Sequence, residues 1–135
     1  MEIALDGTYS VDLVGDSPAL GTLTIGAASG SPTLRVNGLN LTVAGEVTVT
    51  SGAVLSLTSS ALAATSLTIA PGAALNTAGT QTTIQAALDN QGTITADGPE
   101  GLAIDGPDGV HTNSGAITAN SGFFVVVNKI GRAHV

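Results

Sequence analysis

The sequence predicts an all-β chain wound into a right-handed parallel β-helix, a solenoid of about five coils with roughly 20–27 residues per coil. Two observations lead to this prediction. A short phrase recurs at intervals of a few tens of residues, which is the mark of a stacked repeat architecture. The apolar residues are mostly Ala, Val, Leu and Ile, and turn-forming Gly, Ser, Thr, Asn and Asp are spread along the chain. This composition suits short strands around a narrow, layered interior.

The recurring phrase is an aliphatic residue followed by Thr, usually with Gly two positions before it. Successive phrases are separated by offsets of 24, 20, 27 and 23, about the length of one coil. A left-handed helix of hexapeptides would instead repeat every ~18 residues with little scatter, so the right-handed form is expected. The phrases are Leu23-Thr24, Val47-Thr48, Leu67-Thr68, Ile94-Thr95 and Ile117-Thr118, and the glycines are Gly21, Gly45, Gly92 and Gly115.

Two longer matches support this register. Residues 47–55 align with residues 67–75 at an offset of 20, and residues 90–96 align with residues 113–119 at an offset of 23. Because side chains alternate along a strand, the aliphatic residue and the residue two positions on should both face inward. We therefore expect one buried column across successive parallel strands, made of Leu23, Val47, Leu67, Ile94 and Ile117, with Ile25, Val49, Ile69, Ala96 and Ala119 beside it. Further strands are expected at 34–36, 39–43, 54–57, 102–104 and 123–127.

Two other architectures compete with the solenoid. The best helical candidate is Thr83 to Asp89, which is barely two turns long. An all-antiparallel sandwich is the main structural alternative. It does not explain why the same phrase recurs once per coil length along the chain.

The chain divides into three parts. Residues 1–20 are expected to form a partial coil or strand pairing, residues 21–127 the coils, and residues 128–135 a non-native or disordered tail. The hexapeptide from Ile130 to Val135 resembles the translation of a common sequencing adapter, so it is set aside from the fold.

Charge and composition exclude several classes of function. Ten acidic residues against three basic ones give a formal net charge of −7, whereas nucleic-acid binding needs a basic surface. The chain has no Cys, and therefore no disulfide or thiolate metal site. No run of about 20 apolar residues is present, so we expect no membrane insertion by this segment. The residues after Met1 do not form a basic region followed by an apolar one, so we expect no signal peptide in this segment.

Several phrases carry a resemblance to a known group of proteins. GEVTVTSGAVLSL, SLTIAPGAALNT, LDNQGTITA and TNSGAITA resemble the β-strand-repeat passengers of filamentous-haemagglutinin and autotransporter-type bacterial proteins, over roughly residues 20–127. The resemblance implies a fragment of a large surface or secreted protein, located outside the cell or at its surface. It implies a structural stalk or an adhesin whose ligand is a host or matrix component, with carbohydrate as one candidate class. It transfers no active-site motif.

The acidic stretch from Asp97 to Gly109 is the best metal candidate. Its four carboxylates are those of Asp97, Glu100, Asp105 and Asp108, and they could supply oxygen ligands to Ca²⁺. The stretch lacks the spacing of a calcium-binding loop, and Asp-Gly and Gly-Pro are ordinary turn formers. A solvated turn is therefore the preferred interpretation, and no metal site is assigned.

His111 is the one histidine outside the suspect tail, and it is expected to be a surface residue in a turn. General acid–base chemistry needs a placed partner, and the sequence identifies none. Arg35 is the only cation outside the last residues, whereas lyase chemistry on a β-helix usually needs a basic proton abstractor. No catalytic residue and no cofactor is therefore assigned.

The Thr residues of the five phrases should form one outward column, and regular Thr arrays can bind ice. The neighbouring outward row is broken, because it reads Thr22, Glu46, Ser66, Thr93 and Ala116. The β-propensity of Thr explains the column without ice binding. Asn90 and Asn113 are interpreted as turn residues of an Asn ladder between coils.

These features favour a non-enzymatic structural or adhesive segment. The alternative is a fragment of a polysaccharide-active lyase or hydrolase whose catalytic coils lie outside this chain. A solenoid also has open sheet edges, which recruit other strands. We expect end-to-end self-association, with the apolar run from Phe123 to Val127 as its main candidate.

Overall fold

The computed structural model describes residues 1–105, 111–120 and 125–128, and throughout these residues the chain is all-β with every strand pairing parallel. The strands form three faces of a coil, which we call faces 1, 2 and 3. Face 1 contains β1 (Glu2–Ile3), β4 (Leu23–Ile25), β7 (Glu46–Val49), the second halves of β9 (Ala61–Ile69) and β11 (Thr82–Asn90), and β14 (Thr112–Asn113).

Face 2 is a separate six-stranded sheet. It contains β2 (Ser10–Leu13), β5 (Thr33–Asn37), β8 (Val54–Thr58), β10 (Ala74–Ala78), β12 (Thr93–Ala96) and β15 (Ala116–Ala119). Face 3 contains β3 (Ala19–Leu20), β6 (Asn40–Val43), the first halves of β9 and β11, β13 (Leu102–Asp105) and β16 (Val125–Asn128). β9 and β11 bend from face 3 into face 1, so these two faces form one ten-stranded sheet.

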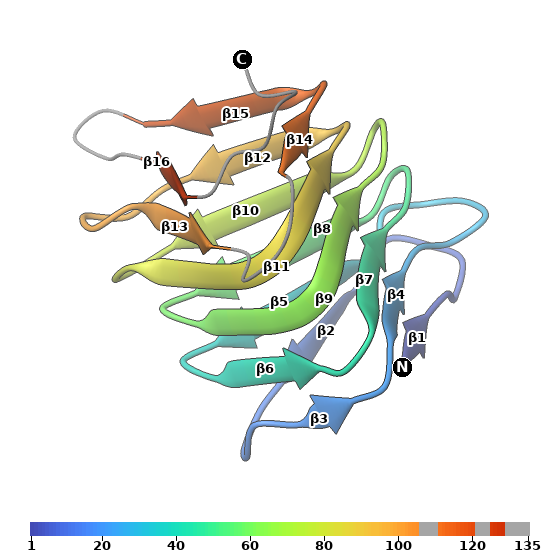
Figure 1. Ribbon diagram of the computed structural model, residues 1–135. Coiled ribbons are helices and arrows are strands. Elements are labelled where there is room, and N and C mark those ends of the chain that lie inside the picture. The colour runs from blue at the N-terminus through green and yellow to red at the C-terminus, as the bar shows by residue number, and fades with distance from the viewer. Residues whose placement is uncertain (106–110, 121–124, 129–135) are drawn as a thin grey trace.

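Each coil visits faces 1, 2 and 3 in turn, and the chain winds right-handed from coil 1 (β1 to β3) to coil 6 (β14 to β16) (Figure 1). Residues 3, 25, 49, 69, 90 and 113 are paired in succession, so equivalent positions recur at offsets of 22, 24, 20, 21 and 23. The predicted parallel solenoid is confirmed, and its length of about five turns agrees with the five steps from residue 3 to residue 113. The segment from Thr83 to Asp89 is part of β11 and not a helix.

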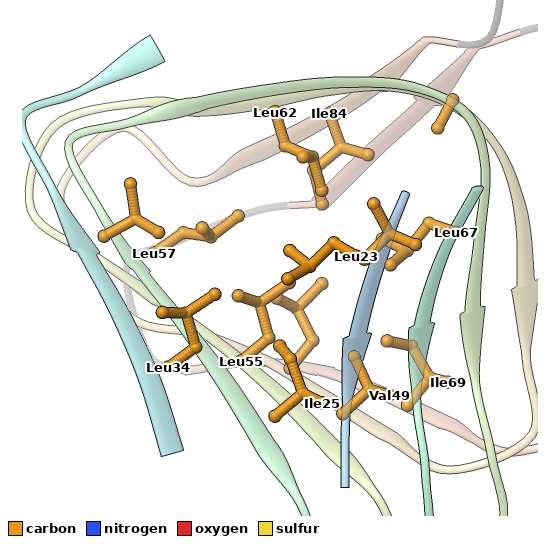
Figure 2. Packing of buried hydrophobic residues seen from close by; sticks show 14 of the residues in the cluster. Leu23, Ile25, Leu34, Val49, Leu55, Leu57, Leu62, Leu67, Ile69 and Ile84 are labelled. Atoms are coloured by element: carbon orange, nitrogen blue, oxygen red, sulfur yellow. The ribbon is translucent and has the colours of Figure 1, made fainter. Parts of the chain in front are cut away.

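The interior is a set of aliphatic columns that run along the solenoid. Leu34, Leu55 and Leu57 of face 2, Leu62 and Ile84 of face 3, and Leu23, Leu67 and Ile69 of face 1 point into the same narrow space (Figure 2). All eight of these side chains are completely buried. No coil has enough apolar surface to enclose this space alone, so the columns are the source of stability.

The prediction of a single column through all five phrases was wrong. Leu23, Val47 and Leu67 are paired in succession on face 1, as predicted, and the next residue of that column is Leu88. Ile94 and Ile117 lie on face 2 instead, in a column with Leu34, Leu55 and Leu75. Both offsets found in the sequence are correct, because residue 47 pairs with residue 67 and residue 94 with residue 117.

The phrase marks two different corners of the coil, which explains the error. Gly21 and Gly45 precede face 1, whereas Gly92 and Gly115 precede face 2. At both corners the chain passes close to the coil below it. A Cβ on Gly45 would lie 2.9 Å from the carbonyl oxygen of Gly21, and a Cβ on Gly92 would lie 2.5 Å from that of Ala70. The need for a small residue is therefore the same at two places in one coil.

The corner between faces 1 and 2 is closed in coil 4 by a tight turn that the sequence specifies directly. The amide of Ala73 donates to the carbonyl of Ala70 at 3.0 Å, with Pro71 and Gly72 between them. Gly72 has φ +81°, and a type II turn needs a positive φ at its third position. Pro-Gly is therefore the residue pair that this corner favours.

We predict that Gly92→Ala lowers the free energy of unfolding by about 2 kcal/mol or more, because the new methyl group collides with the carbonyl groups of Ala70 and Ala73. Gly21→Ala is the matched control, since no atom lies within 4 Å of the position that its Cβ would take. Its effect should stay within about 0.5 kcal/mol. Urea denaturation of both variants measures the difference, and equal midpoints would contradict the close-packed corner.

Candidate functional site

The acidic stretch does not form a cluster in the described part of the chain. Glu100 accepts a hydrogen bond from the backbone amide of Gln81 at 3.2 Å, and Asp97 accepts one from the side-chain amide of Asn120. One carboxylate oxygen of Asp105 is buried without a hydrogen-bond partner within that part of the chain. Asp108 lies outside the described residues. Among the described residues no three His, Cys, Asp or Glu side chains are grouped so that they could hold a metal ion.

His111 is not a surface residue, so that prediction was wrong. Its side chain is only 4% exposed. Because Asp89 pairs with Thr112, His111 lies opposite Leu88 and extends the column of Leu23, Val47 and Leu67. Its Nδ1 accepts a hydrogen bond from the backbone amide of Leu88 at 3.1 Å. An imidazole here supplies an acceptor to the neighbouring coil.

Asn90 was expected in a turn, but it is the last residue of β11 and is completely buried. It continues the column of Ile3, Ile25, Val49 and Ile69. A buried amide needs partners for its donors and its acceptor.

The Asn ladder supplies these partners, and its prediction is confirmed. The Nδ2 group of Asn90 donates to Oδ1 of Asn113 at 2.7 Å and to the carbonyl of Ala116 at 3.1 Å. Its Oδ1 accepts from the amide of Gly92 at 3.2 Å. The match between residues 90–96 and 113–119 was the signal for this contact. The burial of Asn90 was missed because an Asn two positions before a Gly normally indicates a turn.

Together these residues form a polar joint between coils 5 and 6, which we define as Asp89, Asn90, His111, Thr112 and Asn113. On its outer side the hydroxyl of Thr112 donates to Oδ1 of Asp89 at 2.8 Å, and the side-chain amide of Gln91 donates to Oδ2 of Asp89 at 2.7 Å. Coils 2 to 4 have aliphatic residues at the two inward positions that Asn90 and His111 occupy here. The polar joint is the most concentrated set of side-chain hydrogen bonds in the described chain.

The predicted single Thr column was also wrong. Thr24, Thr48 and Thr68 do form an outward column on face 1, but Asp89 is its next member. Thr95 and Thr118 lie on face 2, in the outward column that starts at Asp12. The row beside the face 1 column reads Glu46, Ser66 and Ala87. No regular two-row Thr array of the kind needed for ice binding results on the described faces.

Arg35 lies in the outward column of face 2. Its guanidinium group is 3.8 Å from a carboxylate oxygen of Asp12, and both side chains are 58% exposed. An ion pair this exposed contributes little to stability. The cation is therefore at the surface, and its nearest charged partner is an acid of the coil below.

No family model, no curated protein and no solved structure matches this chain. No helix with the length and apolarity of a membrane span occurs in the described ranges. The side chains themselves are therefore the basis for assigning a function.

We predict that Asn90→Asp destabilises the protein by about 3 kcal/mol or more, because a buried carboxylate would face two oxygen acceptors, those of Asn113 and Ala116. Asn90→Leu should cost less, about 1–3 kcal/mol, since it only leaves hydrogen-bonding groups without partners. Denaturation curves measure both changes, and faster hydrogen exchange at the Gly92 amide should accompany them.

The control for added charge is Asn76→Asp, at an exposed outward position of face 2. Its effect should remain within about 0.5 kcal/mol. If Asn90→Asp were as mild as this control, the hydrogen-bonded burial of Asn90 would be contradicted.

Proposed function

We propose that this chain is a non-enzymatic structural or adhesive β-helix segment of a large bacterial surface or secreted protein. One observation carries the proposal. Four of the polar side chains that the sequence singles out bond one coil to the next: Asp97 to Asn120, Glu100 to Gln81, His111 to Leu88, and Asn90 to Asn113. Each of the four has a structural role in the stack, and no reaction is needed to account for its position.

The shape supports a stalk or display scaffold. Successive coils add ~4.8 Å each to a rod whose backbone hydrogen bonds run along its axis. The outward side chains therefore repeat at that interval along each face. Face 2 presents the polar column Asp12, Arg35, Ser56, Asn76, Thr95 and Thr118. Such a column can donate and accept hydrogen bonds at regular spacing, which suits a repetitive ligand such as a polysaccharide of a host surface or matrix.

Location outside the cell or at its surface belongs to the same proposal. It rests on the resemblance of the repeat phrases to passenger segments of secreted bacterial proteins. The acidic balance of ten acids to three bases is consistent with a soluble, displayed surface.

The test measures turnover and retention in one experiment. The purified chain is incubated with pectin and with alginate, with and without Ca²⁺, and we expect no new chain ends and no unsaturated products. Immobilised polymer of the same kind should retain the protein if this segment is adhesive. Turnover that is lost on changing a single residue, such as Glu100→Gln, would contradict the proposal and favour the enzymatic alternative.

Two double variants, one on each face, test which face binds the immobilised polymer. Asn76→Ala with Thr95→Ala changes the outward column of face 2, and Thr48→Ala with Thr68→Ala changes that of face 1. We expect the first pair to reduce retention several-fold and the second to leave it unchanged. Equal effects of the two pairs would show that the face 2 column is not the contact surface.

A further inference from the structure

Face 2 carries a strip of uncharged outward side chains on coils 3 to 6, along β8, β10, β12 and β15 (Figure 1). None of these four strands contains a charged residue. The strip consists of two outward columns, which together we call the neutral strip. One column has a hydroxyl or an amide in every coil and is made of Ser56, Asn76, Thr95 and Thr118. The other has small side chains and is made of Val54, Ala74, Thr93 and Ala116.

The polar column of the neutral strip takes no part in holding the coils together. Within the described chain none of its four side chains forms a hydrogen bond, whereas the hydroxyl of Thr50 on face 1 donates to the carbonyl of Ile25. Two of the four, Asn76 and Thr118, are exposed, and the other two are half-buried. Their donors and acceptors are therefore accessible to a ligand.

Acidic side chains interrupt the corresponding surface of face 1. Its outward column of Thr48 and Thr68 begins at Glu2 and continues to Asp89, and Glu46 lies in the row beside it. A ligand along face 1 would therefore meet carboxylates in coils 1, 3 and 5.

The charged groups of face 2 lie at the margins of the neutral strip. Arg35 is in β5, below the strip, where its guanidinium group is 3.8 Å from a carboxylate oxygen of Asp12. Asp97 follows β12 and accepts a hydrogen bond from Asn120. Each of these charged groups has a partner within the protein, so the strip itself presents neutral groups.

We infer that the ligand of face 2 is a neutral polysaccharide that lies along the solenoid axis on the neutral strip, with one sugar residue over each coil. The inference rests on the proposed adhesive function and specifies the ligand class of that same site. Coils repeat every ~4.8 Å along the axis, and one sugar residue of an extended polysaccharide is about as long. Hydroxyl groups of successive sugars then meet the polar column, while their C–H groups pack against the small side chains beside it.

A polymer with a carboxylate on each sugar does not fit the same surface. Binding would remove each carboxylate from water, and the neutral strip has no cation to compensate for this loss. Asp97 would add repulsion at coil 5. A neutral sugar only exchanges hydrogen bonds with water for hydrogen bonds with hydroxyl and amide groups, so it avoids both penalties.

The axial direction of the ligand is tested with single variants at the two ends of the polar column. Ser56 and Thr118 are three coil steps apart, about 14 Å. A ligand along the axis contacts both, so Ser56→Ala and Thr118→Ala should each reduce retention on the neutral polymer several-fold. A ligand that crosses the coils contacts only one of them, so a loss confined to one variant would overturn the axial arrangement.

A variant with an added cation tests the location. Asn76→Lys places a positive charge in the middle of the neutral strip, so it should raise retention on de-esterified pectin several-fold and lower retention on a neutral polymer. Thr48→Lys is the matched control, because it adds the same charge to the outward column of face 1. Circular dichroism checks that both variants fold, and equal gains from the two would overturn the assignment of the ligand to the strip.

The ligand class is tested on immobilised polymers that differ in charge, with a chelator present so that Ca²⁺ cannot bridge carboxylates. Highly methyl-esterified and de-esterified pectin share a backbone, and galactan and xylan supply further neutral backbones. We expect the unmodified chain to be retained on at least one neutral polymer and several-fold less on de-esterified pectin, with a smaller difference in high salt. Equal or stronger retention on de-esterified pectin would overturn the neutral ligand but leave the adhesive function in place. Retention on none of the polymers would overturn both.

Discussion

The structure depends on one constraint: a coil can bury its apolar side only against the coils before and after it. A single coil has two or three short strands and a few inward aliphatic residues on each face, too few to enclose a core. Stacking in register solves this, because parallel backbone hydrogen bonds hold equivalent residues one above another. The columns of Leu23, Val47 and Leu67 and of Leu34, Leu55 and Leu75 are direct consequences.

The same constraint determines what the corners contain. Coils that stack at strand spacing bring the backbone of each corner against that of the coil below, and a Cβ is excluded at Gly45 and Gly92 for this reason. Polar corner residues then bond along the stack. The hydroxyl of Thr50 reaches the carbonyl of Ile25 at 3.2 Å, and that of Thr65 reaches the carbonyl of Ala44 at 3.0 Å. Corners and columns are thus both coil-to-coil contacts.

Stacking also explains why polar residues can enter the interior at the polar joint. Asn90 replaces an aliphatic residue in its column, but the next coil presents Asn113 and the carbonyl of Ala116 at hydrogen-bonding distance. The buried imidazole of His111 likewise meets a backbone amide of the coil below. A buried polar group of this kind costs free energy when the register shifts, so it specifies which residues pair. The aliphatic columns of coils 2 to 4 exclude a shift of one residue, which would turn them outward, but they discriminate weakly against a shift of two residues.

The sequence by itself determined the architecture, because strand periodicity, Pro-Gly and Asn-Gly turns and the offsets of 20 and 23 are local properties of the chain. The register of residue 47 on 67 and the ladder of Asn90 on Asn113 were also predictable, since each joins two similar segments one coil apart. The assignment of phrases to faces was not. Gly-x-aliphatic-Thr suits either of two corners, so only the folded coil separates Val47 on face 1 from Ile94 on face 2.

The burial of His111 and the separation of Asp97 from Glu100 were likewise decided by the tertiary structure. Each depends on which residue of the neighbouring coil lies opposite, and that partner is a whole coil away in the sequence: Leu88 for His111, Asn120 for Asp97 and Gln81 for Glu100. Loops of unequal length between these partners shift the pairing by several residues without changing the local pattern. Composition and spacing therefore specify a stack of coils, whereas the contacts between coils specify what each polar side chain does.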